Sequence, residues 1–124
     1  MEIINHSRDA FFITDASGNA VYSNQAYFNL NNATTLDEVQ SPEGLFAEAP
    51  EAAQALYRLS QAALKGQSAD EEIRIDRGLR GRGAAWYRIV TAPSKRAGGR
   101  AYQVWRVADV TQERDRQETV FHEL

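Results

Sequence analysis

Residues able to carry out chemistry are few in this chain and far apart in its sequence. The 124 residues include two histidines, His6 and His122, one near each end, and no cysteine. A catalytic site needs a nucleophile, a base and oxyanion donors that converge, and both histidines lie outside the predicted core strands. The lack of cysteine excludes a disulfide framework, a thiolate zinc site and a cysteine nucleophile. We therefore predict that this segment has no metal site and is not an enzyme.

Acidic and glycine-rich positions have structural explanations. Three aspartates stand where turns and helix caps are predicted, and not as a paired catalytic set: Asp9, Asp15 and Asp109. The glycine-rich run at 77–83 connects two predicted strands, whereas a phosphate-binding fingerprint connects a strand to a helix. Neither group of residues indicates a catalytic or phosphate-binding site.

The charge distribution is uneven, although the net charge is only −3. From Arg77 to Arg106 every charged residue is basic. Such a patch can attract phosphates or an acidic partner, so a nucleotide-binding patch built from this arginine cluster is one alternative. Arginines beside glycines are more typical of solvated hairpin tips, and we expect no nucleic-acid partner.

The length of the chain indicates one domain, which should bury about two-thirds of its unfolded surface. There is no apolar run long enough to span a bilayer and no basic-then-apolar leader, so we expect no membrane contact by this segment. Together with the absence of cysteine, this favours the cytoplasm, although a parent protein can still be anchored in a membrane.

Apolar periodicity predicts the elements that must position any site. Alternating residues indicate strands at 10–14, 20–23, 71–76, 84–92 and 101–109. Asn24 is a good N-cap for a short helix through Leu30, and Pro50 begins a longer helix that Gly66 ends. A lead-in at 1–9 precedes these elements, and residues 41–44 are expected to break the chain. The order of two strands, helices and three strands predicts an α+β fold with an antiparallel sheet.

The last predicted strand passes directly into the charged segment QERDRQETVFHEL. Asp109 or Thr111 can cap the helix that this segment should form, and Asp109 with Gln112 fits a capping box. In the helix, Val110, Gln117 and Leu124 fall on one heptad seam, with Arg114 and Phe121 on the other. Because two of these five positions are polar, we expect weak and easily biased helix pairing.

Three stretches, in this order, resemble the motifs of PAS domains: ITDASGNAVYSNQAY, GAAWYRIVTAP and WRVADVT. The resemblance covers nearly the whole chain and implies a five-stranded antiparallel sheet, with helices on one face and an outgoing C-terminal helix. It also implies that the last strand lies between the first and the fourth. The tail is further similar to the connector between tandem PAS domains of an alphaproteobacterial, cell-cycle type hybrid histidine kinase. We expect a lead-in at 1–9, a PAS domain at 10–109 and a signalling helix at 110–124.

The resemblance also bears on cofactors. Flavin photosensors of the LOV type and yellow-protein chromophores need a cysteine, and haem-binding PAS domains usually ligate iron through a histidine on the long helix. This chain has no cysteine, and residues 51–65 contain no histidine. The resemblance therefore argues against haem and covalent chromophores and leaves a noncovalent flavin or a small metabolite open.

Matching Pro93 and Asp109 to the family positions implies which strand residues face the cavity under the helices. The expected lining is Phe12, Thr14, Tyr27, Leu30, Tyr87, Ile89, Thr91, Gln103, Trp105 and Val107. Because so many large side chains converge, we expect them to fill the cavity themselves. The alternative is a receptor in which the polar members of this set contact a small ligand.

The opposite face of the sheet should carry apolar residues and two arginines: Phe11, Ile13, Trp86, Arg88, Val90, Tyr102, Val104 and Arg106. Exposed patches of this composition usually mark contacts. We expect a homodimer through this face and the N-terminal segment, or else cover of the face by Met1–Arg8 or by a neighbouring segment of the full chain. The predicted function is that of a noncatalytic sensory or interaction module of a signal-transduction histidine kinase. It would act beside other PAS or kinase domains and couple core or interface changes to the exit at Asp109, Val110 and Thr111.

Overall fold

The computed structural model describes residues 9–76, 84–95 and 99–123, with side chains of the last helix described to residue 118. The strands in these ranges are β1 (Ala10–Asp15), β2 (Ala20–Ser23), β3 (Ala69–Asp76), β4 (Ala84–Lys95) and β5 (Ala101–Asp109). The helices are α2 (Gln25–Asn31), α3 (Pro42–Leu45), α4 (Ala53–Leu64) and α5 (Thr111–Glu123), with 3-10 turns η1 (Leu36–Glu38) and η2 (Pro50–Ala52). Residues 1–8 of the lead-in expected at 1–9, and the glycine-rich turn at 77–83, lie outside the described residues.

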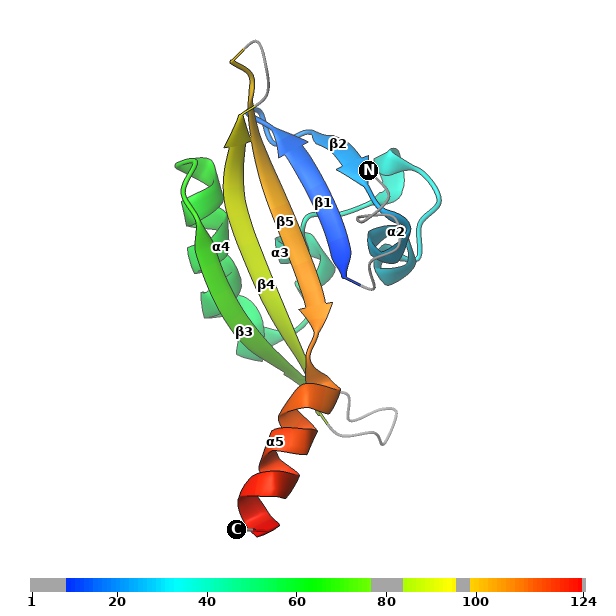
Figure 1. Cartoon of the computed structure of the whole chain (residues 1–124). Coiled ribbons are helices and arrows are strands. Elements are labelled where there is room, and N and C mark those ends of the chain that lie inside the picture. Colours follow the sequence, from blue (N-terminus) through cyan, green and yellow to red (C-terminus); the bar gives the residue numbers. More distant parts are fainter. Residues whose placement is uncertain (1–8, 77–83, 96–98, 124) are drawn as a thin grey trace.

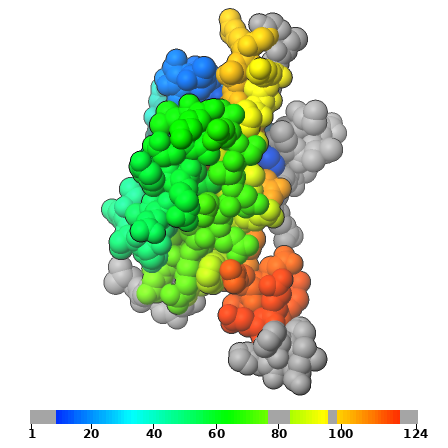
Figure 2. All heavy atoms as spheres, turned by 90° about the vertical axis from the view of Figure 1, so that its left-hand side faces the viewer, coloured from blue at the N-terminus to red at the C-terminus, as the bar shows by residue number. Residues whose placement is uncertain are grey.

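The strands form one antiparallel sheet in the order β2-β1-β5-β4-β3. The last strand therefore lies in the centre, paired with β1 on one side and β4 on the other, as the resemblance implied. Helices α2, α3 and α4 cover one face of the sheet, and α5 projects beyond the end of β5 (Figure 1). Figure 2, a quarter turn away, shows α4 spread over the body of the domain and α5 as a separate projection. The predicted α+β fold with a C-terminal outgoing helix is confirmed.

Local chemistry explains how the first hairpin and the first helix form. Asp15 Oδ1 accepts hydrogen bonds from the backbone N–H groups of Ser17 and Asn19, both at 2.9 Å, and Gly18 has φ +86°. Asn24 Oδ1 accepts from the N–H of Tyr27 at 3.0 Å and caps α2. Both features follow the predictions from the sequence.

Several predicted boundaries were wrong. Strand β3 begins at Ala69 and not at residue 71, and Pro50 starts the 3-10 turn η2, so that α4 begins only at Ala53. Residues 41–44 do not simply break the chain, because Pro42 starts the short helix α3 and the N–H of Leu45 bonds to the carbonyl of Ser41 at 2.9 Å. The strand predicted at 84–92 does not end before Pro93, because β4 continues to Lys95. Since Thr91 pairs with the first residue of β3, Ala69, the strand beyond it has an open edge on that side, where a proline is tolerated.

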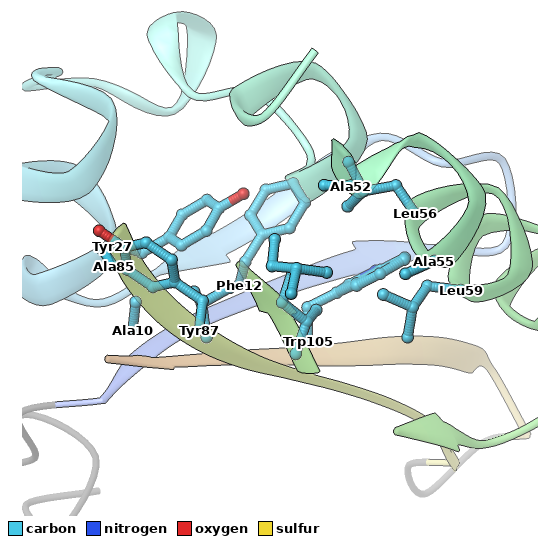
Figure 3. Packing of buried hydrophobic residues seen from close by; sticks show 13 residues of the cluster. Ala10, Phe12, Tyr27, Ala52, Ala55, Leu56, Leu59, Ala85, Tyr87 and Trp105 are labelled. Atoms are coloured by element: carbon cyan, nitrogen blue, oxygen red, sulfur yellow. The ribbon is translucent and has the colours of Figure 1, made fainter. Parts of the chain in front are cut away.

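The core lies between the sheet and the covering helices. Burial alternates strictly along β1 and most of β4 and β5, so that one set of side chains faces the helices. These side chains pack with the inner faces of α2 and α4, including Leu56 and Leu59 of α4 (Figure 3). Full burial of each large apolar side chain stabilises the fold by about 1.5 to 3 kcal/mol.

Candidate sensory core and signal exit

The structure brings the ten predicted lining residues together under the helices. All but Leu30 are buried, and Leu30 is partly buried and packs against the same cluster. Tyr27, Ile89 and Thr91 are fully inaccessible to solvent. Strands β1, β4 and β5 place eight of the ten side chains on the inner face, because alternate residues of a strand point the same way. The other two, Tyr27 and Leu30, come from α2.

Aromatic rings occupy much of this space. The rings of Phe12 and Tyr27 stack with centroids 4.8 Å apart, and those of Phe46 and Tyr87 meet at 5.2 Å. Trp105 is 5% exposed and lies close to Ala55 and Leu59 of α4 (Figure 3). Phe46 was not predicted, because it follows a short helix in a stretch without clear apolar periodicity.

Polar groups of the core find partners within the protein. Gln103 Nε2 donates to Thr91 Oγ1 at 2.9 Å and to the carbonyl of Gln67 at 3.0 Å. The hydroxyl of Tyr27 donates to the carbonyl of Gln40. Burial raises the pKa of Tyr27, which keeps the hydroxyl a neutral donor. A ligand that binds to Gln103, Thr91 or Tyr27 would have to replace these existing hydrogen bonds.

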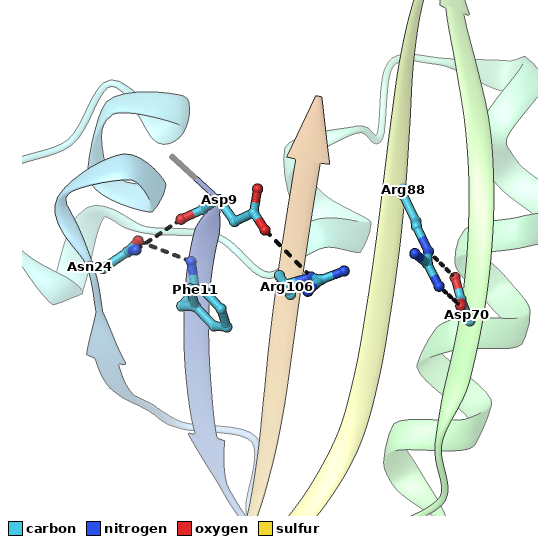
Figure 4. A network of polar contacts seen from close by, with 6 residues as sticks. All are labelled: Asp9, Phe11, Asn24, Asp70, Arg88 and Arg106. Carbon is cyan, nitrogen blue, oxygen red and sulfur yellow. Dashed lines mark hydrogen bonds and ion pairs between the residues drawn. The ribbon is translucent and has the colours of Figure 1, made fainter. Parts of the chain in front are cut away.

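Asn24 ties the start of β1 to the core helix α2. Besides capping α2, its Oδ1 accepts from the N–H of Phe11 at 2.9 Å, and its Nδ2 donates to the carbonyl of Asp9 at 2.9 Å (Figure 4). The sequence predicted only the cap. The link to β1 depends on the hairpin folding back, which no local signal reports.

The outer face of the sheet carries the eight predicted interface residues, and all eight are half-buried: Phe11, Ile13, Trp86, Arg88, Val90, Tyr102, Val104 and Arg106. Its two arginines have acidic neighbours (Figure 4). Arg88 forms a two-pronged ion pair with Asp70 of β3, and Arg106 Nε lies 3.7 Å from Asp9 Oδ2. The hydrogen bond from Arg88 lowers the pKa of Asp70, so this pair stays ionised at neutral pH.

The predicted signal exit, at residues 109–111, is hydrogen-bonded to β4 as well as continuous with β5. The N–H of Val110 donates to the carbonyl of Trp86 at 2.9 Å, and the N–H of Trp86 donates to Thr111 Oγ1 at 2.9 Å. Asp109 Oδ1 accepts from the N–H of Thr111 at 2.9 Å. Thr111 is the first residue of α5, and its hydroxyl bonds to β4 instead of capping the helix, which corrects one of the two predicted caps.

Trp86 therefore belongs to the exit as well as to the outer face. The guanidinium carbon of Arg114, on α5, lies 3.8 Å from the centroid of the Trp86 ring. This is a cation–π contact. The sequence placed Trp86 in the interface alone, because the path of α5 past β4 is a tertiary feature.

The described part of the chain holds no cluster of three or more potential metal ligands. None of its helices is long and apolar enough to cross a membrane.

No family model matches the chain. The sequence is 40% identical over 122 residues to Sensor kinase CckA of Brucella abortus; the match covers 90% of this chain and 13% of the kinase. The chain thus spans a small part of this curated relative.

Solved structures share the fold at low identity. An RNA-binding Light-Oxygen-Voltage receptor is 21% identical with a TM-score of 0.64, covering 99% of this chain and 36% of that chain. A domain described as part of a light and redox sensing histidine kinase from Haloarcula marismortui is 19% identical with a TM-score of 0.58, covering 89% and 96%. A PAS domain from Colwellia psychrerythraea is 16% identical with a TM-score of 0.56, covering 90% and 93%.

The sheet order, the helices on one face, the helix that follows β5 and these likenesses point to one fold. The chain has the fold of PAS domains and is similar, over 90% of its length, to a segment of a sensor kinase.

Proposed function

We propose that this PAS domain passes changes in its core or on its outer face to α5 and so to the output of a signal-transduction histidine kinase. The observation that carries the proposal is the double role of β5. Gln103 and Trp105 are buried in the core, whereas Tyr102 and Val104 lie on the outer face of the same strand. The strand then runs into the exit that is hydrogen-bonded to Trp86, so a shift of β5 from either side reaches α5.

The proposed roles follow the division of the chain into sheet, outgoing helix and N-terminal segment. Residues 10–109 form the sensing unit, and residues 110–124 form the linker that carries the signal to neighbouring PAS or kinase domains of a two-component system. Residues 1–9 form a lead-in. Support comes from the kinase relative, of which this chain matches only a small part. We propose that the module lies in the cytoplasm, because a chain without cysteine does not depend on an oxidising compartment to form disulfides.

We infer that the core works without haem or a covalent chromophore. Stacked rings and satisfied polar groups favour a space filled by the protein's own side chains. A receptor for a metabolite or a noncovalent flavin is the second candidate, because the fold is shared with Light-Oxygen-Voltage domains, one of them described with a flavin analogue. The arginine-cluster alternative has less support, since Arg88 and Arg106 lie beside carboxylates.

Purified protein is expected to be colourless. An absorption spectrum should show the aromatic band near 280 nm and no Soret or flavin band, because the chain offers no cysteine for an adduct and no histidine on α4. Native mass spectrometry of the same sample should give the mass of the polypeptide alone. A flavin or haem band at stoichiometric occupancy would overturn the proposal of a filled core and favour the receptor.

Replacing Tyr102 by alanine is expected to weaken self-association about tenfold, because aromatic side chains dominate interface energies. Tyr102 is half-buried on the outer face of β5. The matched control is Tyr57→Ala on α4, whose side chain is 61% exposed and belongs to the helical side of the domain. Sedimentation equilibrium of the parent and both variants measures the effect. A parent that is monomeric throughout, or equal effects of the two substitutions, would refute dimerisation through the sheet face.

A further inference from the structure

A second attachment of α5 lies one turn beyond the exit. While its guanidinium stacks on the ring of Trp86, Arg114 also reaches Glu72 on the edge strand β3. The Nε and Nη2 atoms of Arg114 lie 3.1 and 3.0 Å from Glu72 Oε1. Arg114 therefore joins the output helix to two strands that are distant from it in sequence.

Exposure along α5 shows how far this docking extends. Thr111 and Arg114 are half-buried, whereas the other described side chains of the helix, at 112, 113 and 115–118, are exposed. Among the described side chains of α5, Arg114 is thus the last that packs against the sheet. Its contacts set the direction in which the helix leaves the domain.

The heptad pattern of α5 assigns Arg114 to a core position, which conflicts with its docked orientation. Val110, Arg114 and Gln117 follow each other at core spacing, so pairing of α5 with the helix of a second copy would turn Arg114 toward that helix. A core position points at the partner, and the docked Arg114 points at Trp86 and Glu72. One guanidinium cannot hold both positions.

We propose that Arg114 is a latch that makes docking of α5 on the sheet edge and pairing of α5 with a second copy mutually exclusive. In the docked state Glu72 and the Trp86 ring retain the guanidinium. Loss of either contact frees α5 from β3 and β4 beyond Thr111 and allows the helix to swing toward its partner. The latch rests on the proposed function, because it regulates the same output helix.

Glu72→Gln tests the latch without touching the helix. Glu72 lies on β3, so this substitution weakens docking and leaves the heptad sequence intact. The matched control is Glu71→Gln, which removes the neighbouring ion pair of Glu71 with Arg58 of α4, at 2.8 Å on the other face of the same strand. Hydrogen exchange at residues 112–118 is measured in dilute solution, and self-association of the whole chain by sedimentation.

The latch predicts that Glu72→Gln speeds exchange in this part of α5 and tightens self-association, each about two- to fivefold, the shift expected from one surface ion pair. Glu71→Gln should change neither. Unchanged exchange in Glu72→Gln would overturn the latch as a docking contact. Faster exchange with unchanged or weaker self-association would overturn its competition with pairing. In both cases transmission through Asp109 and Thr111 would remain standing, because that exit is tested by separate variants.

Discussion

Replacing Trp105 by alanine is expected to lower the free energy of unfolding by about 3 to 5 kcal/mol, the usual cost of truncating a buried aromatic side chain. Trp105 is 5% exposed and lies on the central strand, where it packs toward α4 (Figure 3). Rigid strands on both sides of β5 limit the collapse that would refill the space. Urea unfolding measures this loss: the midpoint should fall while the m-value stays unchanged.

Trp86→Ala provides the matched control, since it removes the same side chain from the outer face. Its ring is half-buried and contacts Arg114, so the expected loss is smaller, about 1 to 2 kcal/mol. Equal losses in the two variants would contradict a core centred on the helix-facing side of β5.

The space opened by Trp105→Ala also separates the two interpretations of the core. Indole should raise the urea midpoint of this variant, because an apolar void accepts an apolar guest, and should leave the wild type unchanged. Stabilisation of the wild type by indole would reveal a vacancy that exists before mutation and would support the receptor alternative.

Much of this architecture could be predicted because the sheet has one strongly buried face. In β5, Gln103, Trp105 and Val107 alternate with Tyr102, Val104 and Arg106, and the period of two separates the two faces. The choice of which face belongs to the core came from matching Pro93 and Asp109 to the family positions. Caps such as Asn24 could also be predicted, since they act within one turn of the chain. The relation of the last strand to its neighbours came from the family resemblance.

Contacts between distant segments could not be predicted. Phe46 reaches Tyr87 from a helix too short to show a period, and Gln103 bonds to a loop carbonyl at Gln67. Arg88 pairs diagonally with Asp70, although Glu72 is its direct cross-strand neighbour. Such choices depend on side-chain reach and sheet twist, which the one-dimensional pattern does not encode.

The double substitution of Asp109 and Thr111 by alanine is expected to loosen α5 while the sheet stays folded. Asp109 loses the bond to the first helical N–H, worth about 0.5 to 2 kcal/mol. Thr111 loses the bond that fastens the helix to β4, and the N–H of Trp86 is left without this acceptor at a cost of about 1 to 3 kcal/mol. Thr111→Ser, which keeps the hydroxyl, serves as the control and should behave as the wild type.

Hydrogen exchange across residues 110–123, compared with β1, β4 and β5 in wild type and the double variant, tests transmission through the exit most directly. We expect faster exchange throughout α5 and unchanged protection of the three strands, because the lost bonds hold the helix and its start against the sheet and do not join the strands to one another. Unchanged protection of α5, or an equal loss of protection in helix and sheet, would contradict a local joint between the sensing sheet and its output helix.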